Sequence, residues 1–161
     1  MRSYRQTSGF TLVELMITVA IIGVLAMGVA PLAKLGIQRA KEAELRAALR
    51  DIRTAIDAYK DAADSGRIHK DFDKSGYPAN LDDLVNGVED VKSPTHGKMI
   101  YFLRRIPRDP MNPDATGPAY RTWGLRSYAS TAESPLPGED IFDVYSLSKR
   151  VAIDGTPYSK W

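Results

Sequence analysis

The most informative residue in the sequence is an acid at the edge of an apolar segment. Residues 15–33 carry no charged side chain over 19 positions, and Glu14 precedes them, four residues after Phe10. A carboxylate in a low-dielectric environment is costly unless a positive charge pairs with it. A cut after Gly9 would create an α-amine on Phe10, one helical turn from Glu14. The candidate chemistry of this region is therefore the pairing of an amine with a carboxylate.

The polar segment in front of this run, residues 1–9, contains two arginines and no acid, and three interpretations of it compete. It could open a secretory signal peptide cut after the small-x-small sequence at residues 28–30, although Glu14 opposes insertion by up to ~2.5–3.5 kcal/mol near the bilayer centre. It could precede a plain single-span anchor with Glu14 near the interface. In the third and favoured interpretation it is a short leader, cleaved between Gly9 and Phe10.

Helix geometry indicates what the apolar run and the residues after it form. Nineteen helical residues span roughly 28 Å, close to the ~30 Å hydrocarbon thickness of a bilayer. We expect one helix over residues 10–65, because opposite charges lie four apart at 42/46, 53/57 and 60/64 and predict an exposed helical face. The opposite face is apolar with spacings of 4, 3, 4 and 3, at Leu45, Leu49, Ile52, Ile56 and Tyr59.

The residues that follow this helix are rich in glycine and proline and should pack on its apolar face, because they hold too small a core to stand alone. The elements that we expect there are a short capped helix at residues 80–85, antiparallel strands at residues 121–130 and 139–147, and a third short strand at residues 151–153 or 158–161.

Composition excludes several functional classes. Lys and Arg number 22 against 20 Asp and Glu, so the net charge of +2 gives no reason to propose a nucleic-acid partner. The absence of cysteine removes disulfides, zinc-thiolate sites and thiol nucleophiles. The sequence contains no GxSxG, Walker or HExxH motif, so we expect no enzyme activity.

Several motifs together resemble a known family. Gly9–Leu15 and the apolar run resemble the class III leader junction of type IV pilins and type II secretion pseudopilins. The order of the later motifs is that of major pseudopilins of type II secretion systems: Gly76–Pro78, Leu81–Leu84, Ile106–Pro110, Trp123–Gly124 and Asp143–Leu147. The resemblance implies the type IV pilin fold, of α+β class, in which a long N-terminal α-helix with a membrane-embedded apolar half packs on a small C-terminal antiparallel β-sheet domain.

The same resemblance divides the chain into four parts. Residues 1–9 are a leader that the prepilin peptidase, a membrane aspartic peptidase, removes before it N-methylates Phe10. Residues 10–34 form the transmembrane and filament-core helix, and residues 35–65 continue it as an amphipathic helix. Residues 66–161 form a periplasmic α+β domain.

The function that the family implies is structural. The subunit enters the inner membrane with a single pass and polymerises into a helical homopolymer, a periplasmic pseudopilus for type II protein secretion across the outer membrane. Glu14 pairs with the Phe10 amine of a neighbouring subunit and sets the axial register. The other implied partners are minor pseudopilins and the inner-membrane assembly platform. The alternatives are a subunit of a type IV or competence pilus, and a membrane-anchored periplasmic enzyme or binding module.

Three residues weaken the apolar half of the helix. Glycine costs ~1 kcal/mol and proline ~3 kcal/mol in a helix interior. By resemblance, the segment that contains Gly23, Gly28 and Pro31 melts or stretches when a subunit moves from the bilayer into the filament. The alternative is that these residues have no special role, since membrane helices tolerate them.

The family also suggests a metal. Major pseudopilins commonly bind calcium in the loop after the Asp-x-Tyr/Phe-Ser-Leu strand. Here that loop, residues 148–155, has two cations where an acid is expected, which leaves Asp154 with Ser146, Ser148 or backbone carbonyls as oxygen donors. Calcium at these three residues is the candidate cofactor, and the alternative is an ordinary loop fixed by the packing of Trp161.

Overall fold

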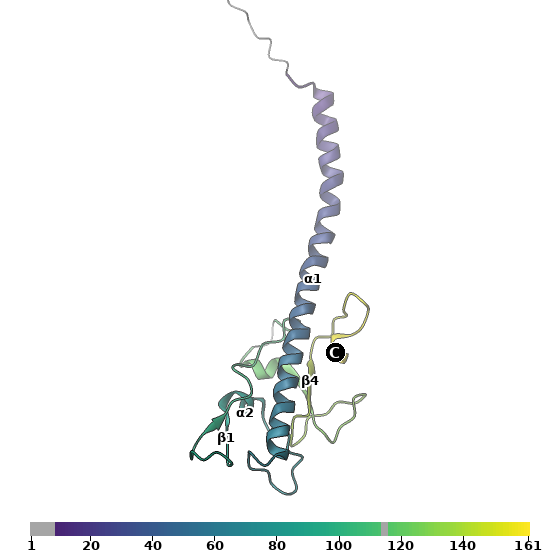
Figure 1. The fold of residues 1–161 in the computed structure, drawn as a ribbon. Helices are drawn as coiled ribbons and strands as arrows, with labels where there is room; N and C mark the ends of the chain where they lie inside the picture. Colours follow the sequence, from purple (N-terminus) through teal and green to yellow (C-terminus); the bar gives the residue numbers. More distant parts are fainter. Residues whose placement is uncertain (1–8, 114–115) are drawn as a thin grey trace, which may run out of the picture. The chain divides into compact units, whose positions relative to one another are not determined.

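The computed structural model describes residues 9–113 and 116–161, and it describes the side chains of all of them except residues 27–32. The chain divides between Arg39 and Ala40 into two compact units. One helix, α1 (Leu12–Asp64, 53 residues), contributes to both units, and we describe each unit by itself (Figure 1). The sequence predicted this helix over residues 10–65.

A Schellman motif ends α1. Gly66 adopts a φ of +67°, which a residue with a side chain rarely takes. The Gly66 N–H donates to the Ala63 carbonyl at 3.0 Å, and the Arg67 N–H donates to the Ala62 carbonyl at 2.8 Å. Ile68 is then buried against Ala62 and Ala63, so the chain turns back onto the last turn of the helix.

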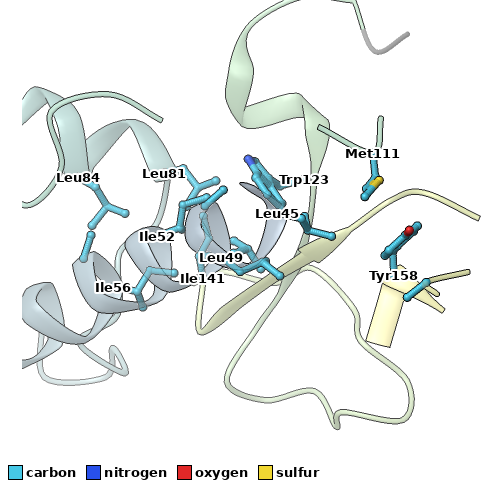
Figure 2. Close-up of a cluster of buried hydrophobic side chains, with 14 residues drawn as sticks. Leu45, Leu49, Ile52, Ile56, Leu81, Leu84, Met111, Trp123, Ile141 and Tyr158 are labelled. Atoms are coloured by element: carbon cyan, nitrogen blue, oxygen red, sulfur yellow. The ribbon is translucent and has the colours of Figure 1, made fainter. Parts of the chain in front are cut away.

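The core of the second unit is built on the apolar stripe of α1. Leu45, Ile52 and Ile56 have no exposed surface, which confirms the face predicted from their spacing. Figure 2 shows these side chains gathered with others from the C-terminal half of the chain. The core partners that come from outside α1 are Leu81, Leu84, Met111, Trp123, Ile141, Val144, Ala152 and Tyr158.

The short predicted helix is present as α2 (Leu81–Asn86). The Asn80 N–H donates to the Asp83 carboxylate at 3.1 Å, which is one half of a capping box. Gly87, with a φ of +80°, ends the helix where the Tyr101 ring would lie 2.9 Å from an added Cβ. The capping bond at Asn80 and the turn at Gly87 therefore fix the two ends of α2. The helix places Leu81 and Leu84 in the core.

Two small antiparallel sheets complete this unit. β3 (Trp123–Arg126) pairs with β4 (Asp143–Ser146), with Trp123 opposite Ser146, so the predicted strand pair is confirmed within shorter bounds. Gly124 is required there, because a Cβ would lie 2.3 Å from the Tyr145 ring. The sequence did not predict the second sheet, β1 (Val88–Glu89) with β2 (Met99–Ile100), nor the 3₁₀ turn η1 (Ala119–Thr122).

The prediction of a third short strand, at residues 151–153 or 158–161, is wrong. Residues 151–153 contribute only a one-residue bridge between Val151 and Pro157, and the chain then forms a 3₁₀ turn, η2 (Tyr158–Lys160). The reason is local, since Gly155 turns with a φ of +84° and Pro157 has no N–H for a strand ladder.

Asp140 joins two loops of the domain. Its carboxylate accepts from the Ser127 hydroxyl at 2.6 Å, from the Tyr128 N–H at 2.9 Å and from the Ser75 hydroxyl. Burial alone raises the pKa of the Asp140 carboxyl, but the hydrogen bonds outweigh burial and leave the pKa below its ordinary value. The charged form of Asp140 is thus stabilised in the folded state.

We predict that Ile52→Ala lowers the free energy of unfolding by about 2–5 kcal/mol, because it leaves a cavity in the core. Ile37→Ala is the matched control on the same helix, since Ile37 is 61% exposed, and it should change stability by less than about 0.5 kcal/mol. Urea unfolding of the detergent-solubilised chain, followed by tryptophan fluorescence, measures both. Equal effects of the two substitutions would contradict the burial of the stripe.

We also predict a pH dependence for Asp140. A carboxyl with a lowered pKa in the folded state stabilises the fold above its unfolded pKa, which is about 4. This stabilisation is lost as the pH falls through the folded pKa. Asp140→Asn should therefore destabilise the chain at neutral pH, and the difference from the parent should shrink in acid. A difference that is constant from pH 7 to pH 3 in urea titrations would refute the assignment.

Candidate assembly site

The start of α1 is fixed by a capping hydrogen bond. The Thr11 hydroxyl accepts from the Glu14 N–H at 3.2 Å, and the Thr11 carbonyl accepts from the Leu15 N–H at 3.1 Å. Thr11 is thus the N-cap, and the sequence Thr-x-x-Glu matches a capping box. This motif was not predicted from the sequence, and through it the Glu14 main-chain N–H takes part in capping its own helix.

Glu14 also lies where a helix favours an acid. It is in the first turn of α1, close to the positive end of the helix dipole. The capping bond uses its main-chain N–H, so it does not compete with an ion pair at the carboxylate. The helix start can therefore hold Glu14 in place while its carboxylate meets another group.

Apolar side chains surround Glu14 on every face of the helix. All of residues 9–26 are exposed in the isolated chain, and Phe10 is 80% exposed. A helix that is apolar all round requires an apolar environment, because water disfavours a contiguous surface of this kind. The exposed apolar residues are Phe10, Leu12, Val13, Leu15, Met16, Ile17, Val19, Ile21, Ile22, Val24 and Leu25.

The predicted membrane span is only partly described. In the portion of the chain whose placement is defined, no helix combines the length and the apolar character needed to cross a membrane. The predicted run, residues 15–33, includes residues 27–32, whose side chains lie outside the described ones.

The remaining predicted residues of this region are placed as follows. Gly9 is exposed just before α1, whereas the rest of the predicted leader, residues 1–8, lies outside the described residues. The backbone of α1 is helical through Gly23, Gly28 and Pro31, and the space beside Gly23 is open. The side chain of Pro31 and the surroundings of Gly28 are not among those described, so the predicted melting of this segment stays a prediction.

The candidate calcium residues all have partners within the protein. The buried Ser146 hydroxyl donates to the Asp109 carboxylate at 2.6 Å and accepts from the Ser148 N–H at 3.1 Å. Asp154 accepts from the Thr156 N–H at 2.9 Å, and the Thr156 N–H and hydroxyl lower the pKa of the Asp154 carboxyl. Among the described residues, no three acidic, histidine or cysteine side chains group closely enough to hold a metal. Calcium at this loop stays a prediction.

The Ile106–Pro110 motif has a structural role that sequence reasoning did not assign. The Asp109 side chain is buried and accepts from the Met111 N–H at 2.8 Å as well as from Ser146. The indole N–H of Trp123 donates to the Pro107 carbonyl at 2.8 Å. The motif thus connects the loop to both β3 and β4.

Comparison with known proteins identifies the class of this site. Residues 4–30 match the family model described as the prokaryotic N-terminal methylation motif, which spans Gly9, Phe10 and Glu14. The fold described above, a long N-terminal helix with small antiparallel sheets, is that of the type IV pilins.

Curated relatives identify the family within this class. The chain is 31% identical over 147 residues to type II secretion system core protein G of Pseudomonas aeruginosa, covering 89% of this chain and 84% of that protein. It is 29% identical over 109 residues to type II secretion system core protein G of Aeromonas hydrophila, covering 66% of this chain and 68% of that protein. The chain belongs to the family of type II secretion system core protein G, the major pseudopilins. No solved structure gives a significant match.

We predict that Thr11→Val frays the start of α1, because valine keeps the shape of threonine and removes the hydroxyl that accepts from Glu14. The loss of an N-cap costs about 1 kcal/mol, so the Glu14 and Leu15 amides should exchange several-fold faster in detergent micelles. Thr18→Val is the control, since the Thr18 hydroxyl donates to the Leu15 carbonyl and caps nothing. Unchanged exchange in the Thr11 variant would exclude this cap.

Proposed function

We propose that this chain is the major pseudopilin subunit of a type II secretion system, a structural protein that polymerises and catalyses no reaction. One observation carries the proposal. In a member of this family, the start of α1 exposes apolar side chains on all faces, and among them stands one acid, Glu14, whose main-chain N–H is capped by Thr11. Such a surface needs other copies or lipid around it.

The proposed maturation begins with cleavage between Gly9 and Phe10 by a prepilin peptidase, followed by N-methylation of Phe10. The match to the methylation motif and the exposure of both residues directly before α1 support this step. Removal of the leader subtracts two arginines from 22 basic side chains and leaves 20, equal to the number of acids. A subunit near neutrality suits dense self-assembly, since like charges on every copy repel.

In the proposed filament, Glu14 pairs with the Phe10 amine of a neighbouring subunit. Apolar side chains alone permit one helix to slide along another, whereas an ion pair fixes one axial register. Two unit charges 4 Å apart attract by about 4 kcal/mol at an effective dielectric near 20. Repetition of one such heterologous contact generates an open helical array rather than a closed ring.

The chain is membrane-associated, as its family and N-terminal motif indicate. We propose further that it crosses the inner membrane once, with the domain after Ala40 in the periplasm. The proposed partners are the prepilin peptidase, minor pseudopilins and the inner-membrane assembly platform. We also propose that Gly23, Gly28 and Pro31 let α1 stretch as a subunit leaves the bilayer, because each lowers the cost of opening the helix.

We predict that Glu14→Ala abolishes assembly while membrane insertion persists. Loss of the pair should reduce polymer more than about ten-fold, since each ~1.4 kcal/mol changes an equilibrium ten-fold. The measurement is the amount of fibre that sediments after shearing, with the membrane fraction assayed in parallel. Glu44→Ala is the control, because Glu44 is an exposed acid elsewhere on α1. Normal polymer from the Glu14 variant would reject the register role, whereas a parent chain that inserts but forms no polymer would favour a membrane-anchored enzyme or binding module.

We predict that assembled material begins at Phe10 and carries one added methyl group on its α-amine. Mass spectrometry of the mature N-terminus decides this directly. Gly9→Val should leave the leader attached, because a side chain would fill the position next to the cut. Gly36→Val is the control, since Gly36 has open space around it and lies away from the cut. A mature chain that starts after Ala30 would instead identify an exported soluble domain.

A further inference from the structure

The segment after β4, residues 147–161, lies beside α1 (Figure 1). Charged side chains of α1 bind this segment. The charge spacing predicted that Glu42 and Arg53 lie on an exposed helical face. There Glu42 would pair with Arg46, and Arg53 would pair with Asp57. That prediction is wrong for both residues, because Glu42 is only 6% exposed and Arg53 binds Asp143. The third predicted pair, Lys60 with Asp64, is present on the helix surface.

Glu42 binds the two sides of the turn around Gly155. One carboxylate oxygen, Oε1, accepts from the Ile153 N–H at 2.9 Å and from the Tyr158 hydroxyl at 2.9 Å. Tyr158 has no exposed surface. Hydrogen bonds to a carboxylate are stronger than neutral ones, and burial increases the cost of losing them.

Arg53 holds the end of the same segment. Its Nη2 donates to the Trp161 main-chain oxygen at 2.8 Å and to the Val144 carbonyl at 3.1 Å. Its Nε donates to Asp143 at 2.7 Å. The Arg46 guanidinium lies 4.2 Å from the centre of the Trp161 ring, so a third charge from α1 contacts this segment.

The polarity of these contacts is opposite to that of a calcium site. Calcium requires six to eight oxygen donors aimed at one point, at roughly 2.3–2.6 Å. Here the segment turns an N–H and a hydroxyl hydrogen toward a carboxylate, so it offers positive ends to an anion. The sequence also places Lys149 and Arg150 in this loop, and the Ser146 hydroxyl is bonded to Asp109.

We propose that Glu42 and Arg53 together form a C-terminal clasp, which holds residues 147–161 on α1 in place of a bound calcium ion. The Glu42 carboxylate secures the turn around Gly155, and Arg53 secures Trp161 against β4. Both residues act by ordering the segment through these hydrogen bonds.

The test uses the full chain in detergent and measures amide hydrogen exchange of Ile153 together with thermal unfolding. Calcium chloride at millimolar concentration, or EGTA in its place, should leave the exchange and the unfolding midpoint of the parent unchanged. Glu42→Ala should raise the exchange rate of Ile153 about ten-fold or more. Glu44→Ala, two residues away and exposed, should leave it at the parent rate.

A second variant keeps the test decisive where Glu42→Ala does not fold. Glu42→Gln keeps an oxygen acceptor and loses the charge, so it should raise the exchange rate of Ile153 by a smaller factor, while the amides of β3 and β4 stay protected. Protection of Ile153 that rises with calcium and falls with EGTA in the parent would overturn the proposal. Parent-level protection in both Glu42 variants would overturn it as well.

Discussion

The removal of apolar surface from water governs both ends of α1, and each end meets this constraint with a different partner. Along residues 45–59 the apolar side chains occupy one face, so the C-terminal half of the same chain can cover them. Along residues 9–26 they occupy every face, and no single layer of protein from the same chain covers such a helix. The hydrophobic effect therefore drives both the folding of the domain and the assembly of subunits, and it acts on the same helix in both cases.

Buried carboxylates give the domain its specificity in a chain without disulfides. Glu42 and Asp109 are almost fully buried, and Asp140 is partly so. Each of the three accepts hydrogen bonds from two segments that lie far apart in sequence or on opposite sides of a turn. A buried carboxylate that loses its donors is costly, so each of these residues disfavours alternative packings of the loops. The apolar core supplies the driving force, and these acids select one arrangement.

The sequence predicted the features that local patterns determine. The stripe of α1, the short helix α2 and the pairing of β3 with β4 follow from spacing, capping residues and β-branched or aromatic runs. The Thr11 cap is also encoded locally, since the pattern Thr-x-x-Glu at residues 11–14 is that of a capping box. At the candidate site, the sequence predicts Gly9, Phe10 and Glu14 because their signal is contiguous, and the family model matches the segment that contains them.

The contacts that could not be predicted join distant residues. Glu42 binds Ile153 and Tyr158, 111 and 116 residues away, and Arg53 binds Asp143, 90 residues away. Their spacing of four from an opposite charge is typical of surface ion pairs on a helix, and only the tertiary fold shows that both residues bind the C-terminal part of the chain. The strands β1 and β2 were not predicted, because two residues are too few to show the alternation of apolar and polar side chains that indicates a strand.

The position of the Thr11 cap bears on how far a new chain end can reach. A cut after Gly9 leaves a tether of one residue between the amine and the first rigid turn, so the charge follows the helix axis closely instead of sampling a wide volume. The helix dipole repels a cation at this end, which makes an amine held there a poor match for its own helix and a strong attractant for an acid on another. In the proposed maturation, the choice of scissile bond would thus set the geometry of the contact as well as create the charge.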